Sequence, residues 1–464
     1  TYENYQKIRR MRVTSVSKLL NIEESKISFH DHHECHAFYG FYTNPKKNEK
    51  VAVITADGGG DGIYNTVSYF KKGVYKNLVR SNKNWIGKIY SSTTLILGLN
   101  PFRHLYKVMG LAPYAHKKNY KEILKFYLST LKVKNLDFEV NKLAKDNYYY
   151  FKKNLNRFRF DNIAGALQEF VELRLVEWFK NISNKLKINN FVFSGGVANN
   201  VKANKILADQ KFIKSMWIPP GPGDESLCVG AVYNFIYKKL GSSQTMRYIK
   251  TPKNAYWGPR IQTENLKKFK KNQLIKKYFD LSIDKGFLKS ANLLSKGEIL
   301  FVLFDKQEFG QRALGHRSIV CDPSNIPLVK KINSTIKMRD FWMPFTPSIL
   351  EDYKYKYFDY KKNINYEYMT VCADTNELGK RHLSAAIHSA DNTIRPQIVK
   401  KTTCKNYYSL IKAFSKKKGI GSLLNTSLNM HEFPIITQPT DLIKEIIKKN
   451  NSINFSILIE NHLF

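Results

Sequence analysis

Short apolar runs that end in glycine-rich turns, with amphipathic helices between them, constrain the fold of this chain most strongly. One run occupies residues 51–56 and precedes Asp57 and consecutive glycines; another occupies residues 191–193 and precedes the sequence Ser-Gly-Gly. Runs of this length that stop at glycine are typical of buried strands. Strands that alternate with helices predict an α/β fold.

The second half of the chain repeats this organisation. Residues 241–260 are rich in Gly, Ser and Pro, as is typical of a domain boundary, and 464 residues suffice for two or three domains. We expect a first domain of residues 1–245, a linker of residues 246–262 and a second domain of residues 263–464. Further strands are expected at residues 298–304, 318–321 and 421–425, and helices at residues 161–187 and 227–239.

The composition limits where the protein works and what it binds. No apolar run approaches the roughly 18 residues of a membrane span. The 5 cysteines lie far apart without a CxxC pair, which favours a reducing, cytoplasmic location. The net charge of +38 suits a nucleic-acid partner, but the lysines are dispersed among Asn, Ile and Tyr, as codon bias in an AT-rich genome also produces. We therefore favour solvated surface lysines over a nucleic-acid surface.

Two histidines, His32 and His36, are spaced to share one face of a helix, with Asp31 as a possible N-cap. This is how a helix presents two nitrogen ligands to one metal ion. Asp57 and Asp224, each beside glycine, are candidates to complete a site for iron or manganese. The alternatives are a surface histidine pair and aspartates that bond their own turns.

A second pattern predicts a nucleotide site. Gly195 and Gly196 follow a strand, and Asn200 and Asn204 share one face of the next helix. Glycines let the backbone approach a phosphate or purine, and a helix N-terminus supplies N–H groups. The alternative is that the glycines form an ordinary turn.

Cations and polar residues gather near turns in the second half. Arginine forks suit bidentate phosphate recognition, and lysine acts as a point charge. Any one of these residues alone is more often a surface cation, but several clusters together indicate a polyphosphate or acyl-phosphate site. The residues are Arg312, Arg317, Lys337, Arg339, Arg395, Asn425 and Ser427.

A series of motifs runs in one order along nearly the whole chain. The motifs are Asp31-His32-His33 with His36, Asp57-Gly58-Gly59, Lys107-Val108-Met109-Gly110-Leu111-Ala112-Pro113-Tyr114, Ser194-Gly195-Gly196 with Asn200 and Asn204, Pro219-Pro220-Gly221 with Gly223-Asp224, Arg312-Ala313-Leu314-Gly315 with Arg317-Ser318, and Leu424-Asn425-Thr426-Ser427. The chain thereby resembles the NodU/CmcH family of O-carbamoyltransferases. The resemblance implies an ASKHA-like first domain, similar to the threonylcarbamoyl-transfer protein of tRNA modification, and a YrdC-like second domain.

The resemblance also implies a two-step reaction. The second domain would form carbamoyl adenylate from carbamoyl phosphate and ATP, with Mg²⁺, and the first would transfer the carbamoyl group to a hydroxyl of a sugar or natural product. The family pattern places Fe²⁺ or another divalent metal on His32, His36, Asp57 and Asp224. It places phosphate-gripping residues at the second-half cations and polar residues named above. It places the nucleotide at Gly195, Gly196, Asn200, Asn204 and Lys107, and suggests a homodimer.

The chain departs from the family pattern at three places. Met343 stands where many members have arginine, and Leu105 stands where an acidic residue is expected. The chain also opens just ahead of the metal motif, whereas members of this fold begin with further strands. We therefore expect an N-terminally truncated ASKHA domain that transfers carbamoyl poorly, while adenylate formation survives.

Other functions compete with this interpretation. A tRNA threonylcarbamoyladenosine enzyme also combines such halves, and the net charge of +38 favours it, whereas the fusion order and the motif at Arg312 favour a small-molecule acceptor. A non-catalytic nucleic-acid-binding protein requires clustered basic patches with exposed aromatics. A kinase is a weaker alternative, because ASKHA domains include sugar kinases.

Overall fold

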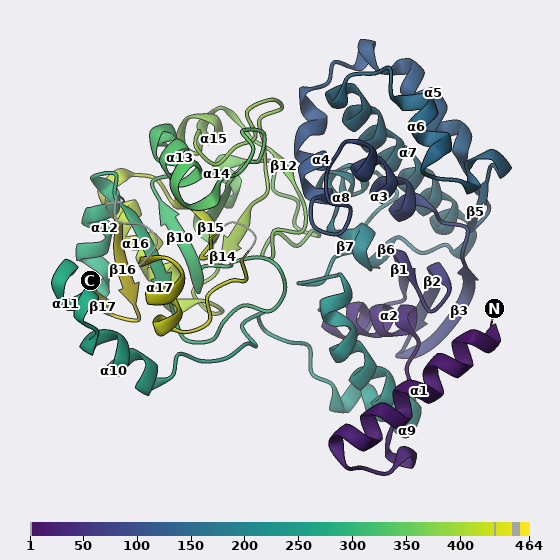
Figure 1. Ribbon diagram of the computed structural model, residues 1–464, viewed down its shortest axis with the longest axis horizontal. Helices are drawn as coiled ribbons and strands as arrows, with labels where there is room; N and C mark the ends of the chain where they lie inside the picture. Colours follow the sequence, from purple (N-terminus) through teal and green to yellow (C-terminus); the bar gives the residue numbers. More distant parts are fainter. Residues whose placement is uncertain (1, 431–432, 448–454) are drawn as a thin grey trace.

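Two sheets with accompanying helices occupy opposite ends of the long axis of the molecule (Figure 1). The computed structural model describes residues 2–430, 433–447 and 455–464. One sheet is built from residues 51–217 and the other from residues 282–463. The α/β class is therefore confirmed. The ASKHA-like and YrdC-like assignments and the domain boundaries remain predictions.

The first sheet brings the ends of two neighbouring strands together at the predicted site. Its order is β3-β2-β1-β6-β7, with β1, β2 and β3 antiparallel and β1, β6 and β7 parallel. Since Thr55 of β1 pairs with Ser194 of β6, Asp57 lies beside the turn that follows β6. The strands are β1 (Val51–Gly60), β2 (Ile63–Lys71), β3 (Val74–Ser81), β6 (Asn190–Ser194) and β7 (Ser215–Trp217).

Helices accompany this sheet, and a separate hairpin lies among them. The expected helix at residues 161–187 is present as α7, whereas α9 runs past its predicted end to Tyr248, with a kink at Gly241 (φ 71°). The helices are α1 (Tyr2–Leu20), α2 (His32–Thr43), α3 (Ile86–Ile96), α4 (Leu105–Leu111), α5 (Lys121–Thr130), α6 (Tyr149–Leu155), α7 (Phe160–Leu186), α8 (Val201–Ala208) and α9 (Leu227–Tyr248), and the hairpin is β4 (Leu131–Lys134) with β5 (Asp137–Val140).

The second sheet has the order β14-β11-β15-β10-β9-β16-β17-β8. The strands expected at residues 298–304, 318–321 and 421–425 are present as β9, β10 and β15. The strands are β8 (Ser282–Ile283), β9 (Ile299–Leu303), β10 (Arg317–Cys321), β11 (Thr346–Leu350), β14 (Gln397–Val399), β15 (Ser422–Ser427), β16 (Phe455–Ile459) and β17 (His462–Leu463), and β12 (Ala373–Asp374) pairs separately with β13 (Thr393–Ile394).

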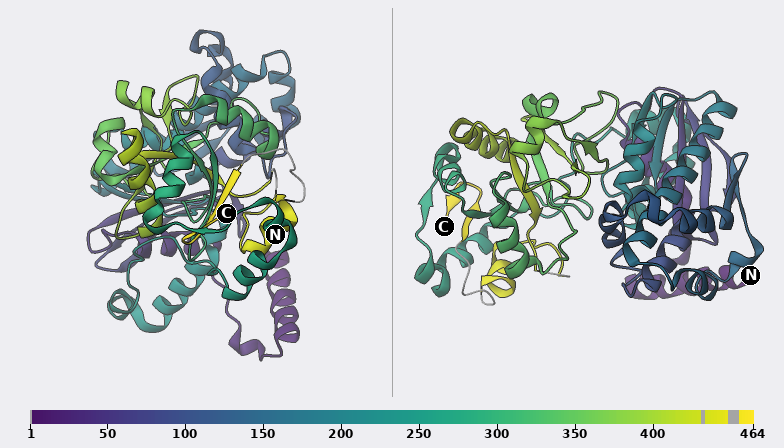
Figure 2. Two further views of the ribbon diagram at one scale, coloured as in Figure 1. Left: turned by 90° about the vertical axis from the view of Figure 1, so that its left-hand side faces the viewer. Right: turned by 90° about the horizontal axis from the view of Figure 1, so that it is seen from above.

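The helices of the second half cover this sheet, and buried contacts join the two halves. The apolar core under the first sheet extends to Ile364, Val371 and Ile398 of the second half, and the halves lie side by side when seen from above (Figure 2). The helices are α10 (Thr263–Lys271), α11 (Gln273–Tyr278), α12 (Leu288–Ser295), α13 (Ile326–Ile332), α14 (Lys354–Tyr357), α15 (Glu377–His382), α16 (Lys405–Lys418) and α17 (Pro439–Glu445).

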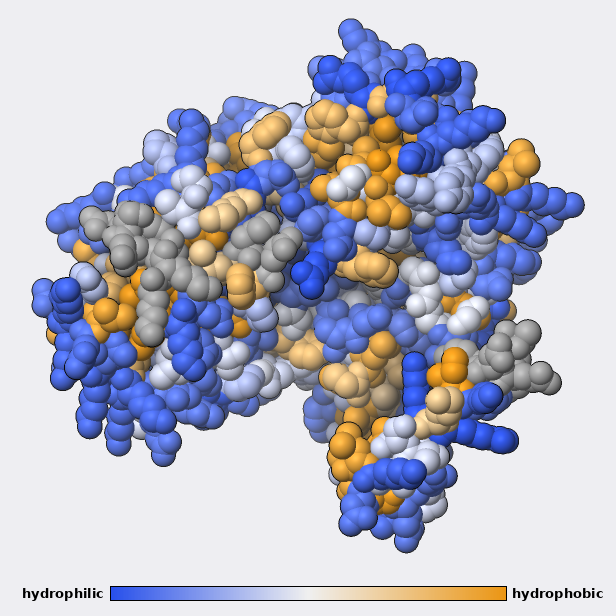
Figure 3. All heavy atoms as spheres, viewed as in Figure 1, coloured by the Kyte–Doolittle hydropathy of each residue, from blue (hydrophilic) through white to orange (hydrophobic). Residues whose placement is uncertain are grey.

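The face of the molecule seen in Figure 3 is mainly hydrophilic. Hydrophilic residues cover most of the face in Figure 3, with apolar residues in separate smaller areas. Among the described residues, no helix is long and apolar enough to cross a membrane.

Candidate metal centre and cation-lined cavity

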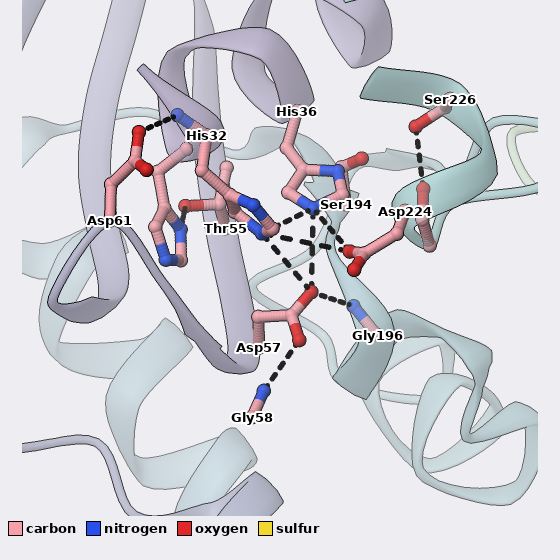
Figure 4. Close-up of polar contacts among 12 residues, drawn as sticks. His32, His36, Thr55, Asp57, Gly58, Asp61, Ser194, Gly196, Asp224 and Ser226 are labelled. Atoms are coloured by element: carbon pink, nitrogen blue, oxygen red, sulfur yellow. Dashed lines mark hydrogen bonds and ion pairs between the residues drawn. The ribbon is translucent and has the colours of Figure 1, made fainter. Parts of the chain in front are cut away.

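The two predicted histidine ligands lie side by side in the first turns of α2 (Figure 4). The N-cap Asp31 accepts a hydrogen bond from the Glu34 amide at 3.0 Å, and the His32 amide donates to Asp61 Oδ2 at 2.9 Å. These contacts satisfy N–H groups that a helix start leaves without intrahelical partners. With α2 fixed in this way, the Nε2 atoms of His32 and His36 lie 3.2 Å apart.

Asp57 reaches the histidines from the end of β1. Its Oδ2 lies 3.3 Å from His36 Nε2 and 3.8 Å from His32 Nε2. The Gly196 amide donates to the same Oδ2 at 2.7 Å, and the Gly58 amide donates to Oδ1 at 2.6 Å. The carboxylate is therefore oriented by two backbone amides before any metal binds.

Asp224 completes the cluster from the loop before α9. Its Oδ1 lies 3.6 Å from His32 Nε2 and 3.5 Å from His36 Nε2, and the four ligand atoms all lie within 4.8 Å of one another. A tetrahedral ion with bonds of about 2.1 Å holds its ligands roughly 3.4 Å apart. The two-histidine, two-carboxylate set and its spacing therefore fit a divalent first-row metal.

Electrostatics inside the cluster favour ionised carboxylates beside the histidines. Burial lowers the pKa of His36, but hydrogen bonds to Asp224 and Asp57 outweigh burial and raise it above its usual value. Burial alone raises the pKa of Asp57, but hydrogen bonds from His32 and His36 lower it below its usual value. This environment suits a cation, which replaces the shared protons when it binds.

The glycine turn after β6 serves the metal cluster. Gly195 has φ 95°, and a Cβ there would lie 2.3 Å from the Ala56 carbonyl oxygen, so only glycine fits without strain. This close approach of the turn to β1 lets the Gly196 amide reach Asp57. The predicted nucleotide contact of Gly195 and Gly196 remains a prediction, and the contact seen is to a carboxylate.

The two asparagines of the same motif are engaged within the protein. Asn200 caps α8 and exchanges two amide hydrogen bonds with Gln168 at 2.9 and 3.0 Å. Asn204 is buried and donates to the carbonyls of Ala198 and Thr370 at 2.7 and 2.8 Å. Asn204 thus connects the two halves of the chain.

A cavity of about 440 Å³ gathers the predicted cations between the two halves. Arg312, Lys337, Arg339 and Arg395 line it, and none of its described lining residues is acidic. Burial lowers the pKa of each of the four, and mutual repulsion adds to this for Lys337, Arg339 and Arg395. Met343, the departure from the family pattern, lines the same cavity.

Three of these cations form no ion pair with any residue that the structure describes. Within the part of the chain that the structure describes, the guanidinium groups of Arg312, Arg339 and Arg395 form neither a hydrogen bond nor an ion pair, and Arg395 Nε is buried without a partner. Lys337 differs, because its Nζ donates to Ser427 Oγ at 3.1 Å and to Asn429 Oδ1 at 2.7 Å. Clustered, partly buried cations without an ion pair to a described residue are costly, so the cavity favours an anionic ligand.

Glu308, which the sequence did not single out, shapes the turn that carries Arg312. Its Oε1 accepts hydrogen bonds from the amides of Leu314, His316 and Arg317 at 2.7, 2.7 and 3.0 Å. A glutamate without a local motif gives no sequence signal for this role.

Three other predicted phosphate-gripping residues do not line the cavity. Arg317 is fully buried and donates to the carbonyls of Thr437, Phe304 and Asp305 at 3.0, 2.6 and 3.1 Å. Asn425 is buried, and its Nδ2 donates a hydrogen bond to Ser348 Oγ at 3.0 Å. Arg317, Asn425 and Ser427 therefore support the cavity wall, and direct contact with phosphate remains a prediction for them.

Lys107, a predicted nucleotide ligand, pairs with a carboxylate of the other half. Its Nζ lies 3.1 Å from Asp340 Oδ2, and its carbonyl accepts a hydrogen bond from Trp342 Nε1 at 3.1 Å. Lys107 thus fixes α4 against the cavity without lining it.

Comparisons with known proteins agree with this arrangement. The profile described as Carbamoyltransferase N-terminus matches residues 2–233, and the profile described as Carbamoyltransferase C-terminus matches residues 291–463. The two matches define the protein as a transferase enzyme. The chain belongs to the carbamoyltransferase family, so the predicted family and enzyme class are confirmed.

Individual relatives span most of the chain. An uncharacterized protein of Methanocaldococcus jannaschii is 31% identical over 93% of this chain and 73% of its own length. Nodulation protein NolO of Bradyrhizobium diazoefficiens is 27% identical over 89% of this chain and 75% of its own. A solved structure of full-length HypF in the phosphate- and nucleotide-bound form has 14% identity, a TM-score of 0.30 and 50% coverage of each chain.

Proposed function

We propose that this carbamoyltransferase uses ATP and carbamoyl phosphate to carbamoylate a hydroxyl group of a small molecule, a sugar or natural product. The observation that carries the proposal is the cavity in which Arg312, Arg339 and Arg395 lie without an ion pair to any described residue. Carbamoyl phosphate and ATP repel each other, and three fixed cations reduce that repulsion while orienting both phosphates. The family match favours carbamoyl transfer over the tRNA-modification alternative.

The first step forms carbamoyl adenylate and releases phosphate and pyrophosphate. Water cleaves carbamoyl phosphate to carbamate and phosphate, and a carbamate oxygen then attacks the α-phosphorus of ATP. The bond from that phosphorus to the bridging oxygen breaks, and pyrophosphate leaves, with Mg²⁺ expected to accompany ATP. Arg312, Arg339 and Arg395 stabilise the charge that develops on the phosphate oxygens.

The second step, transfer of the carbamoyl group, would take place at the candidate metal centre. His32, His36, Asp57 and Asp224 would hold the divalent ion, which we expect to be Fe²⁺ and which supplies Lewis acidity toward the carbamoyl carbonyl. The backbone amide of Gly196 keeps Asp57 in its ligating orientation. The acceptor hydroxyl oxygen then attacks the carbamoyl carbon and loses its proton to solvent, the bond from that carbon to the phosphate oxygen breaks, and AMP leaves.

Carbamoyl-phosphate-dependent exchange of pyrophosphate into ATP tests the proposal. We expect exchange by the unaltered protein and a loss of at least about 100-fold in Arg395→Ala, because one buried charge-assisted contact to phosphate is worth roughly 3 kcal/mol. Arg381→Ala, at an exposed arginine of α15, is the matched control and should keep full exchange. Absence of exchange in the folded, unaltered protein contradicts the proposal.

A further inference from the structure

The cation-lined cavity is not built by the second half alone. Phe102, Tyr106, Met109 and Lys202 of the first half also line it. Arg103 and His104 of the first half line the cavity as well, and the second half adds Met343 and Phe345 beside its three arginines. The cavity therefore offers both a charged surface and an aromatic one.

Contacts around α4 hold these aromatic side chains at the cavity. Lys107 pairs with Asp340 at 3.1 Å on one side of the helix. The Gly110 carbonyl lies 2.8 Å from His388 Nε2 at its end. Because both partners belong to the second half, Tyr106 and the loop just before α4 are fixed relative to the arginines.

Phe102 presents an exposed aromatic ring at the cavity. Its side chain is 92% exposed, and within the described residues its ring stacks on no other aromatic ring. Tyr106 is 36% exposed. Burial lowers the pKa of Arg312 and of Arg339. The Tyr106 phenol opposes this lowering for each arginine, because Tyr106 lies near both guanidinium groups.

We propose that Phe102 and Tyr106 bind the purine ring of ATP, while Arg312, Arg339 and Arg395 bind its phosphates. A flat base stacks on an exposed aromatic ring without needing a particular hydrogen-bonding pattern. A cavity of about 440 Å³ is within the size range of sites for such ligands. This inference rests on the proposed use of ATP, and it makes the nucleotide site a joint property of both halves.

The test compares Phe102→Ala, Phe102→Trp and the unaltered protein in carbamoyl-phosphate-dependent pyrophosphate exchange. We expect Phe102→Ala to raise the KM for ATP roughly 5- to 100-fold, the range expected when one stacked ring is lost. The KM for carbamoyl phosphate should stay unchanged, and the preference for ATP over CTP should narrow. Phe102→Trp should restore the KM for ATP and the preference for ATP over CTP. Phe160→Ala, at a 55% exposed phenylalanine that begins α7, is the matched control.

Two results separate failure of this inference from failure of the proposed function. Exchange by the unaltered protein together with an unchanged KM for ATP in Phe102→Ala contradicts the inference alone. Absence of exchange in the unaltered protein contradicts the proposed function. In that case the affinity for ATP is measured by calorimetry for the unaltered protein and for Phe102→Ala. Equal affinities contradict the inference, and weaker binding by Phe102→Ala supports it.

Discussion

The ligands of the metal cluster differ in how firmly the protein holds them. The His36 imidazole is fully buried, whereas the Asp224 carboxylate is 68% exposed. A buried imidazole beside two carboxylates cannot be replaced by water without moving α2, so His36 is the ligand whose loss should affect metal binding most.

His36→Ala should weaken metal binding at least about tenfold, because the loss of even an outer-shell partner costs that much. Metal content measured after dialysis, with exposed His116→Ala as the control, checks this expectation. Carbamoyl transfer should be lost with the metal, while pyrophosphate exchange in the cavity persists. Loss of both activities in a folded variant would show that the two sites are not separate.

Glu308 is a residue whose removal should destabilise the protein. Glu308→Ala leaves three buried amides without an acceptor, which should lower the free energy of unfolding by about 3 kcal/mol. Glu308→Gln keeps an acceptor oxygen and should lose only about 1 kcal/mol. Urea unfolding of the two variants checks the difference, and equal losses would mean that the charge of Glu308 matters more than its hydrogen bonds.

At the level of elements, α4 connects the first half of the chain to the cavity. The Lys107–Asp340 pair is partly buried, and each partner would be left without its counter-charge if the other were removed. The position of α4 therefore depends on a contact between residues far apart in the sequence.

A double-mutant cycle of Lys107→Met and Asp340→Asn should show this dependence. Each single variant should raise the KM for ATP in the exchange assay, and the double variant should be no worse, with a coupling of about 1 kcal/mol. The exposed Lys380–Glu377 pair should show almost no coupling in the same cycle. Additive effects of Lys107→Met and Asp340→Asn would rule out a direct role for the pair.

Elements and site residues that depend on local sequence could be predicted well. The strands β1 and β6 follow from short apolar runs before glycine, and the His32–His36 pair follows from helical spacing. The contacts of long charged side chains could not be predicted, because the residues that they contact lie in distant parts of the chain. Lys107 contacts Asp340 and Arg317 contacts backbone carbonyls of other segments, and ligand binding by both residues remains a prediction.

For the whole molecule, the net charge of +38 should act on substrate binding more than on folding. Dispersed surface cations and the cavity arginines attract the same anionic substrates, and salt weakens this attraction. We expect the KM values for ATP and carbamoyl phosphate to rise several-fold between about 0.05 and about 0.5 M NaCl. The KM for an uncharged acceptor should not change, and a salt-independent KM for ATP would contradict the electrostatic account.

The loop before α9 reaches toward both sites with consecutive residues. Asp224 belongs to the candidate metal cluster, and the next residue, Glu225, is among the groups that oppose the lowering of the Arg312 pKa by burial. Because the two residues are adjacent in the chain, a backbone movement of this loop displaces both. A movement of the loop at Asp224 and Glu225 would therefore change the geometry of the candidate metal centre and the charge near Arg312 together.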